Sequence, residues 1–266
     1  MNSNSILRAL IFDVDGTLAD TERDGHRVAF NQAFADAGLD WHWDVELYGD
    51  LLRISGGKER MHRYLAERDH NYDRKNADSL IVNLHRAKNQ LYSEMLQQGL
   101  ISLRPGVNRL LSEALDSDLR LAIATTTSRV NVIKLLEKTL HPEAPSWFEI
   151  IATADEIPDK KPSPAVYDYV LEQMGLDASQ SLAFEDSENG LTAAQQAAIP
   201  TIITVNDYTR NGDYSMALLV LSDLGEPEHP FEILGGKAAG TIPGRNGYVT
   251  VDLLRELHRL GQPYEK

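Results

Sequence analysis

The sequence has no cysteine, no long apolar run and a shortage of basic residues. Without cysteine the chain forms no disulfide and offers no thiolate ligand to a metal, which is consistent with a cytoplasmic protein. No apolar run approaches the roughly 20 residues that a bilayer span needs, and the N-terminal residues lack a signal-peptide pattern. With 26 basic and 40 acidic residues, the formal net charge is −14, which disfavours binding to nucleic acid or to an anionic membrane. We expect a cytoplasmic monomer that binds neither.

One segment departs from the acidic average. Residues 51–90 contain nine Lys or Arg and five Asp or Glu. Such a local excess of positive charge would attract an anionic substrate. The alternative is a solvated helical face of mixed charge.

Short apolar runs predict a parallel sheet. Four runs of four to eight residues, rich in Ile, Leu, Val and Phe, are continuous, as in strands covered on both faces. They are ALIFDV (9–14), RLAIATTT (120–127), SLAFED (181–186) and TIITV (201–205), with a weaker run at 148–153. Helical patterns separate the later runs, which predicts an α/β protein with a doubly wound, Rossmann-like parallel-sheet core.

The interval between the first two strands is too long for one crossover helix. It shows helical periodicity, with Phe30, Ala33, Phe34 and Ala37 on one stripe and Leu80, Leu84, Leu91 and Met95 on another. We therefore predict an all-helical cap domain at 19–103, inserted into a core formed by 1–18 and 104–266. From 223 onward we predict a loop, a short strand at 248–251 and a final helix, and we assign this tail no chemistry.

Carboxylates gather where the predicted strands end. In open α/β sheets, functional groups lie beyond the carboxyl ends of the strands. That edge would receive Asp13, Asp15, Glu185 and Asp186. Four carboxylates in one small site repel one another unless a divalent cation neutralises them. Oxygen-only ligands favour Mg²⁺, which commonly binds together with a substrate phosphate.

These positions suit phosphoryl transfer. Asp13, at the end of the strand, is the candidate nucleophile, and Asp15 would donate and accept protons. Thr125 offers a hydroxyl and a backbone N–H to the phosphoryl group. Lys161, in DKKPSP, supplies a fixed positive charge. Lys160 competes for this role, but Lys161 directly precedes the proline turn.

Each of these residues also has a purely structural alternative. The first pair of acids suits a turn and a helix cap, and the second pair suits an acidic loop. The threonines of ATTTS (124–128) suit a strand followed by a helix cap. The lysine suits a surface position before a turn.

Four segments in order carry a family resemblance. DVDGT, a threonine ending the second core strand, KKPSP, and FEDS followed by Gly190 resemble the four motifs of the haloacid dehalogenase-like superfamily. The helical insertion after the first motif resembles its cap. The resemblance implies Asp13 as nucleophile, Asp15 as general acid and base, and a Mg²⁺ site that includes Asp186 and the backbone carbonyl of Asp15. Glu185 is implied as a further ligand, direct or indirect.

Further segments resemble the CbbY-type branch of that superfamily. They are LADTE (18–22), SGGKER (55–60), HRAK (85–88) and ATTTS (124–128), and the similarity spans residues 6 to 222. The branch includes xylulose-1,5-bisphosphate phosphatases, which remove a by-product of ribulose bisphosphate carboxylase in the Calvin cycle. The resemblance implies a phosphatase that forms an aspartyl phosphate and removes the 1-phosphate-type group.

The insertion offers groups for a second phosphate. Gly56 and Gly57, leading into a helix, present backbone N–H groups beside Lys58 and Arg60. His85 and Lys88 lie three residues apart and share a helix face.

Because the stripe of His85 and Lys88 is offset from the leucines, these two residues need not belong to the helical core and are candidate ligands of a distal phosphate. A solvated flank is the alternative. Glu22, at the hinge, would accept hydrogen bonds from sugar hydroxyls, and Asp20 would cap the first cap helix. Thr126 and Thr127 are further substrate-binding candidates in the core.

Two rival functions use the same residues. A β-phosphoglucomutase-like phosphotransferase would return the phosphoryl group to a sugar and not to water. A non-catalytic regulator would bind a phosphometabolite, but a binding module has no use for a nucleophile.

Overall fold

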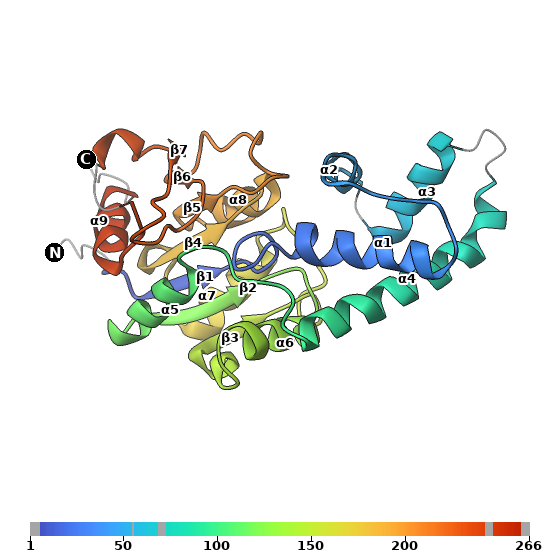
Figure 1. Ribbon diagram of the computed structural model, residues 1–266. Helices are drawn as coiled ribbons and strands as arrows, with labels where there is room; N and C mark the ends of the chain where they lie inside the picture. Colours follow the sequence, from blue (N-terminus) through green and yellow to red (C-terminus); the bar gives the residue numbers. More distant parts are fainter. Residues whose placement is uncertain (1–5, 55, 69–72, 243–246, 262–266) are drawn as a thin grey trace. The chain divides into compact units, whose positions relative to one another are not determined.

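The computed structural model describes residues 6–54, 56–68, 73–242 and 247–261 (Figure 1). Ser55 of SGGKER and part of the C-terminal tail lie outside these ranges. The chain forms two compact units, a core unit of Met1–Asp20 with Ser102–Lys266 and a cap unit of Thr21–Ile101. The bounds predicted from sequence, 19 and 103, differ from this division by two residues at each end.

A seven-stranded sheet forms the centre of the core unit, in the order β3-β2-β1-β4-β5-β6-β7. All pairs are parallel except β6 with β7. The strands are β1 Ala9–Phe12, β2 Arg120–Ala124, β3 Phe148–Ala152, β4 Ser181–Glu185, β5 Thr201–Thr204, β6 Leu219–Leu221 and β7 Ile233–Gly235. The predicted doubly wound α/β core is confirmed, and all five predicted core strands are present.

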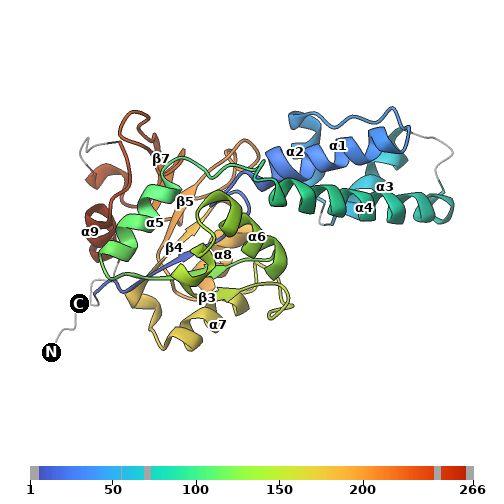
Figure 2. The same ribbon diagram turned by 60° about the horizontal axis from the view of Figure 1, so that its bottom comes forward.

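Helices cover both faces of this sheet. They are α5 Val107–Asp116, α6 Arg129–Thr139, α7 Ala165–Met174, α8 Glu188–Gln196 and α9 Val251–Gly261, with short helices η2 Ala144–Trp147, η3 Ala178–Gln180 and η4 Ala239–Thr241. Helices α7 and α8 pack on a face of small and branched residues that includes Ala9, Ile11, Ala122, Ala124 and Ala183. In Figure 2, α5 and α9 lie together on the face opposite α7. Burial on both faces explains why the strand segments are continuously apolar.

The sequence analysis missed two strands, β6 just before the tail and β7 within it, and the strand predicted at 248–251 is wrong. Val249 donates its N–H to Leu224 O at 2.8 Å, and its own carbonyl accepts from Arg109 Nη1 at 2.6 Å. These partners are a loop and a side chain, so this extended segment joins no ladder. The predicted final helix is present as α9.

The cap unit is all helical within its described residues. Its helices are η1 Thr21–His26, α1 Arg27–Asp36, α2 Val45–Leu52, α3 Gly57–Arg68 and α4 Arg74–Gln97, of which η1 is a π-helix. Its core is aromatic, because the ring of Trp43 lies 4.7 Å from that of Phe30, 4.9 Å from Phe34 and 5.6 Å from Tyr64. Phe30 and Phe34 are buried as predicted, whereas Ala37 is exposed. None of the described helices is long and apolar enough to cross a bilayer.

The buried face of α4 only partly matches the predicted stripe. Leu84 is buried as predicted, but Leu80 is 37% exposed, whereas Ile81, Lys88 and Tyr92 are buried. The series of residues that start at 80 and at 81 both fit a helical period, so leucine content alone could not decide between them. Lys88 therefore belongs to the packed face of the cap, whereas the sequence analysis allowed it to lie outside the core.

Arg109 on α5 fastens the tail to the core unit. Its guanidinium donates to the carbonyls of Val249 at 2.6 Å and Gly225 at 2.8 Å, pairs with Glu226, and lies 4.7 Å from the centre of the Tyr248 ring. Several backbone acceptors of an irregular segment thus depend on one side chain.

We expect Arg109→Leu to lower the free energy of unfolding by about 2–3 kcal/mol, because buried carbonyls lose their donor. Urea unfolding of the whole chain measures this effect. Arg255→Leu, which removes an exposed pair with Asp252 on α9, should change stability by no more than about 0.5 kcal/mol. Equal losses in the two variants would contradict the fastening role of Arg109.

Candidate active site

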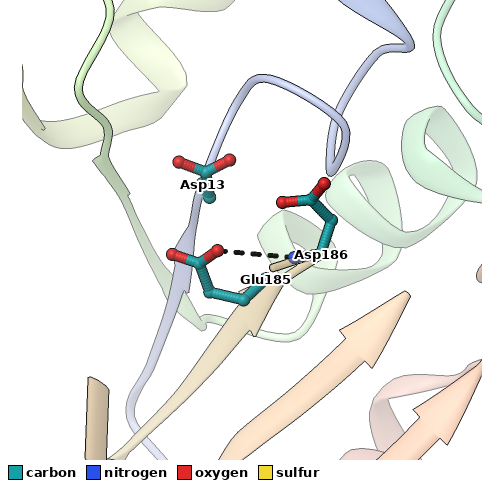
Figure 3. Close-up of side chains that lie close together, drawn as sticks. All are labelled: Asp13, Glu185 and Asp186. Atoms are coloured by element: carbon teal, nitrogen blue, oxygen red, sulfur yellow. Dashed lines mark hydrogen bonds between the residues drawn. The ribbon is translucent and has the colours of Figure 1, made fainter. Parts of the chain in front are cut away.

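The carboxyl ends of β1, β2 and β4 bring the predicted core residues to one edge of the sheet. Asp13 follows β1 and continues its ladder by donating its N–H to Phe184 O at 3.0 Å. Glu185 ends β4 and Asp186 follows it, and all three acids are at most 7% exposed. Figure 3 shows the three carboxylates close together, with the Asp186 N–H directed at Glu185. Parallel neighbouring strands produce this arrangement directly.

Lys161 lies between two of these acids. Its Nζ is 2.6 Å from Asp13 Oδ1 and 2.5 Å from Glu185 Oε1, and it also donates to the carbonyl of Ala124 at 2.8 Å. Burial by itself would lower the pKa of Lys161, but the two carboxylates outweigh it and raise that pKa, so the ammonium stays charged. Lys160, the sequence alternative, is exposed.

Glu185 is held from two further sides. Tyr167 on α7 donates its hydroxyl to Glu185 Oε1 at 2.6 Å. A Cβ on Gly190 would overlap the Glu185 carboxylate, so α8 can pass over this acid only with glycine there. Burial raises the pKa of Glu185 to about 7, even though Lys161 favours its charged form. The sequence analysis did not identify Tyr167, because a tyrosine on an amphipathic helix normally belongs to the hydrophobic core.

The donor set fits a hard divalent cation. Asp13, Glu185 and Asp186 offer carboxylate oxygens that lie within 4.8 Å of one another. Burial, together with Asp13 and Glu185, raises the pKa of Asp186, so the charged cluster lacks compensation that a cation would supply. Both oxygens of Glu185 already accept hydrogen bonds, Oε1 from Lys161 and Tyr167 and Oε2 from the Asp186 N–H, so Asp13 and Asp186 are the better direct ligands. Asp15 is half-buried, and its carboxylate is not part of this cluster.

The threonines after β2 lie at the same edge. Thr125 is buried, and its N–H donates to Ala152 O at 3.0 Å, so the backbone donor expected for the phosphoryl group is used by the sheet. Its hydroxyl accepts from the Thr127 N–H at 3.3 Å. Thr126 is exposed and Thr127 half-buried.

Arg104 and Asn206 support the loop that follows Asp13, and the sequence analysis missed both. Arg104 is buried and donates to the carbonyls of Gly16 and Thr204, the latter at 2.8 Å. It also pairs with Asp20 at 3.4 Å, so this acid has an ionic partner in addition to any capping role. Asn206 donates to Asp186 Oδ2 at 2.7 Å.

Within the cap unit, Glu22 belongs to a polar group with Tyr48 and Arg60. The Tyr48 hydroxyl donates to Glu22 Oε2 at 2.6 Å, and Arg60 Nη1 lies 3.9 Å from the same oxygen. Arg60 also donates to the carbonyl of Ile54 at 3.0 Å. Tyr48 thus joins two residues that the sequence analysis named separately.

A second polar group of the cap contains Lys88. Its Nζ lies 2.9 Å from His26 Nδ1 and about 5 Å from the ring centres of Phe30 and Tyr92. Burial, then Lys88 and Arg60, lower the pKa of His26, so its neutral ring accepts from Lys88. Sequence analysis missed His26, which lies on the π-helix before α1.

The glycine pair lies next to these groups. Gly56 has a φ of +95°, and α3 begins at Gly57. A Cβ on Gly57 would come within 3.1 Å of the His85 ring, so His85 packs against the start of α3. Burial lowers the pKa of His85. Lys58 is exposed.

Comparison with known proteins identifies relatives for nearly the whole core and cap. The family model for haloacid dehalogenase-like hydrolases matches residues 10–204. Protein CbbY of Rhodobacter capsulatus is 48% identical over 218 residues, which is 82% of this chain and 94% of that protein. A plasmid-borne protein CbbY of Cupriavidus necator is 47% identical over 225 residues, which is 84% of this chain and 88% of that protein.

A solved structure shares the fold. CbbY from Rhodobacter sphaeroides, an aspartate-to-asparagine variant in complex with xylulose 1,5-bisphosphate, superimposes with a TM-score of 0.69 at 40% identity. The match covers 88% of this chain and 99% of that chain.

The neutral His26 predicts a pH dependence of stability. Its pKa in the folded cap lies below the unfolded value of 6.5, so the unfolded state binds the proton first as the pH falls. The stability that this group contributes is therefore complete above pH 6.5 and decreases below it, by up to about 1.4 kcal/mol per pH unit.

Melting temperatures between pH 7.5 and 5 should accordingly fall less in His26→Gln than in the wild type, because Gln does not titrate. His141→Gln, at an exposed position, is the matched control and should follow the wild type. A wild-type slope in His26→Gln would show that His26 does not carry the effect.

Proposed function

Because the chain belongs to the haloacid dehalogenase-like hydrolase family, we propose that it is a Mg²⁺-dependent phosphatase of xylulose 1,5-bisphosphate. The observation that carries this proposal is the charged Lys161 between Asp13 and Glu185, beside Asp186, at the carboxyl edge of the sheet. A fixed cation at that position stabilises the negative charge of a transferring phosphoryl group. The choice of substrate is supported by the Rhodobacter sphaeroides CbbY complex with this bisphosphate.

The proposed reaction has two steps. An oxygen of Asp13 attacks phosphorus, the bond from phosphorus to the sugar oxygen breaks, and Asp15 donates a proton to the departing sugar. Water then attacks the aspartyl phosphate while Asp15 takes its proton, which releases phosphate and restores Asp13. The 1-phosphate-type group is the one proposed to leave. Lys161 keeps Asp13 in position through its 2.6 Å contact.

Mg²⁺ would be held by Asp13, Asp186 and the backbone carbonyl of Asp15. When bound it supplies charge neutralisation to the phosphoryl oxygens. Glu185 would act through Lys161, which it contacts at 2.5 Å. The hydroxyls of Thr125, Thr126 and Thr127 would contact the phosphoryl group.

The cap residues suit the rest of the substrate. Lys88, Arg60 and Lys58 supply positive charge for a second phosphate, beside the helix start at Gly57 and the neutral ring of His85. Glu22, oriented by Tyr48 at 2.6 Å, would accept hydrogen bonds from sugar hydroxyls. The same charges favour a bisphosphate over a monophosphate, because a monophosphate offers them no second phosphate to bind. Monomeric state and a cytoplasmic location remain predictions.

Phosphate release tests this function. The purified chain with Mg²⁺ should release inorganic phosphate from xylulose 1,5-bisphosphate faster than from C5 and C6 monophosphates. Isomerisation of a hexose 1-phosphate without phosphate release would instead favour a β-phosphoglucomutase-like phosphotransferase. Asp13→Asn should abolish turnover while it still binds the bisphosphate, because an amide oxygen is a poor nucleophile. Binding without turnover in the wild type would favour the non-catalytic regulator.

Lys88→Met tests the cap contact. It keeps the length of the side chain and removes its charge, so KM for the bisphosphate should rise roughly 10- to 100-fold, the value of a charged hydrogen bond. KM for a monophosphate should change much less. Lys75→Met, on the exposed side of the same helix, is the control. Equal increases in KM for both substrates would argue against a role for Lys88 at the distal phosphate.

A further inference from the structure

Asn206 is a half-buried residue whose side-chain amide contacts the candidate metal site, and it belongs to none of the four motifs. It follows β5 after Val205, and its Nδ2 donates to Asp186 Oδ2 at 2.7 Å. The contact spans 20 residues of sequence and joins the ends of two neighbouring strands. Among the described residues, Oδ2 is the one oxygen of the Asp186 carboxylate for which a side-chain donor is present.

Two contacts fix which end of the Asn206 amide faces Asp186. The Tyr208 N–H donates to Asn206 Oδ1 at 2.9 Å, which requires the oxygen on that side. The nitrogen then faces two groups that accept, the Asp186 carboxylate at 2.7 Å and the Gly16 carbonyl at 3.5 Å. The backbone N–H of Asn206 donates to Thr209 Oγ1 at 3.0 Å, and this hydrogen bond closes the loop that carries the Asn206 side chain.

Arg104 ties this loop to the one that follows Asp13. Its guanidinium donates to the carbonyl of Gly16 and to that of Val205, the latter at 2.5 Å. A side chain at Gly16 would overlap both Asp186 and Asn206, and its φ of +86° also favours glycine. Asn206 is thus held in place by the loop that Arg104 supports, and its shorter side-chain contact is with Oδ2 of Asp186.

We propose that Asn206 is a positioning residue for the metal-binding carboxylate of Asp186. By holding Oδ2, the amide fixes the rotation of the carboxylate and presents Oδ1 to the divalent cation. Hydrogen-bonded partners of metal ligands commonly determine affinity in this way. The proposal rests on the proposed Mg²⁺-dependent function, and its test is chosen to separate the two.

The experiment titrates the substrate-free, full-length chain with MgCl₂. Calorimetry and the Mg²⁺-induced rise in melting temperature measure the Mg²⁺ affinity. Asn206→Leu has nearly the shape of Asn but no donor, and Asn206→Ala is a second variant that cannot clash. Both should bind Mg²⁺ about 10- to 100-fold more weakly than the wild type. The Mg²⁺ concentration for half-maximal phosphate release should rise by the same factor, with KM for the sugar phosphate at saturating Mg²⁺ little changed.

Thr209→Val is the matched control, since it removes the acceptor that closes the same loop without touching Asp186. Its Mg²⁺ affinity should stay within about threefold of the wild type, below the effect expected for a lost ligand partner. Wild-type Mg²⁺ binding in Asn206→Leu and Asn206→Ala would overturn the proposal. So would an equal loss in Thr209→Val, which would assign the effect to loop integrity.

The proposed function can fail separately. If the wild type binds Mg²⁺ but hydrolyses no sugar phosphate, weaker binding in both Asn206 variants still supports the positioning role. If the wild type binds no Mg²⁺ at all, the positioning role falls with it.

Discussion

The contact of Lys161 with Asp13 and Glu185 is the interaction on which the core site depends. Three buried acids meet at the ends of two strands, and their mutual repulsion opposes folding unless positive charge enters. Lys161 reaches them across the sheet edge, with Nζ 2.6 Å from Asp13 and 2.8 Å from the carbonyl of Ala124 on β2. The same ammonium therefore stabilises three strand ends and leaves Asp186 as the acid with the least compensation. This imbalance of charge supports the proposed cation site.

The parts of the fold and site that the sequence predicts are those with short-range or periodic signals. Continuous apolar runs identify parallel strands, and parallel strands place their carboxyl ends at one edge, so Asp13, Glu185 and Thr125 converge without any knowledge of tertiary contacts. Lys161 could be chosen over Lys160 from the proline that follows it. The β6 run was also apolar, but its strand has only three residues and directly precedes the tail, so the sequence analysis missed it.

The parts that the sequence does not predict depend on single side chains meeting over long distances. Arg104 reaches Gly16 across 88 residues and Asn206 reaches Asp186 across 20, and neither position has a local pattern to mark it. The prediction of the buried face of α4 was incomplete for another reason. Two stripes one residue apart both satisfy helical periodicity, and the packing of Lys88 between Phe30 and Tyr92 decides between them.

Two buried lysines with different surroundings would serve the two phosphates of the proposed substrate in different ways. Lys161 lies between carboxylates, so its charge is largely balanced before any substrate binds, and it is suited to holding a nucleophile in place. Lys88 contacts a neutral histidine ring and the faces of two aromatic rings, which lower the cost of its burial. Under the proposed function Lys88 would hold the phosphate that does not react. Binding energy from that phosphate would then assist the reaction at the other end of the substrate.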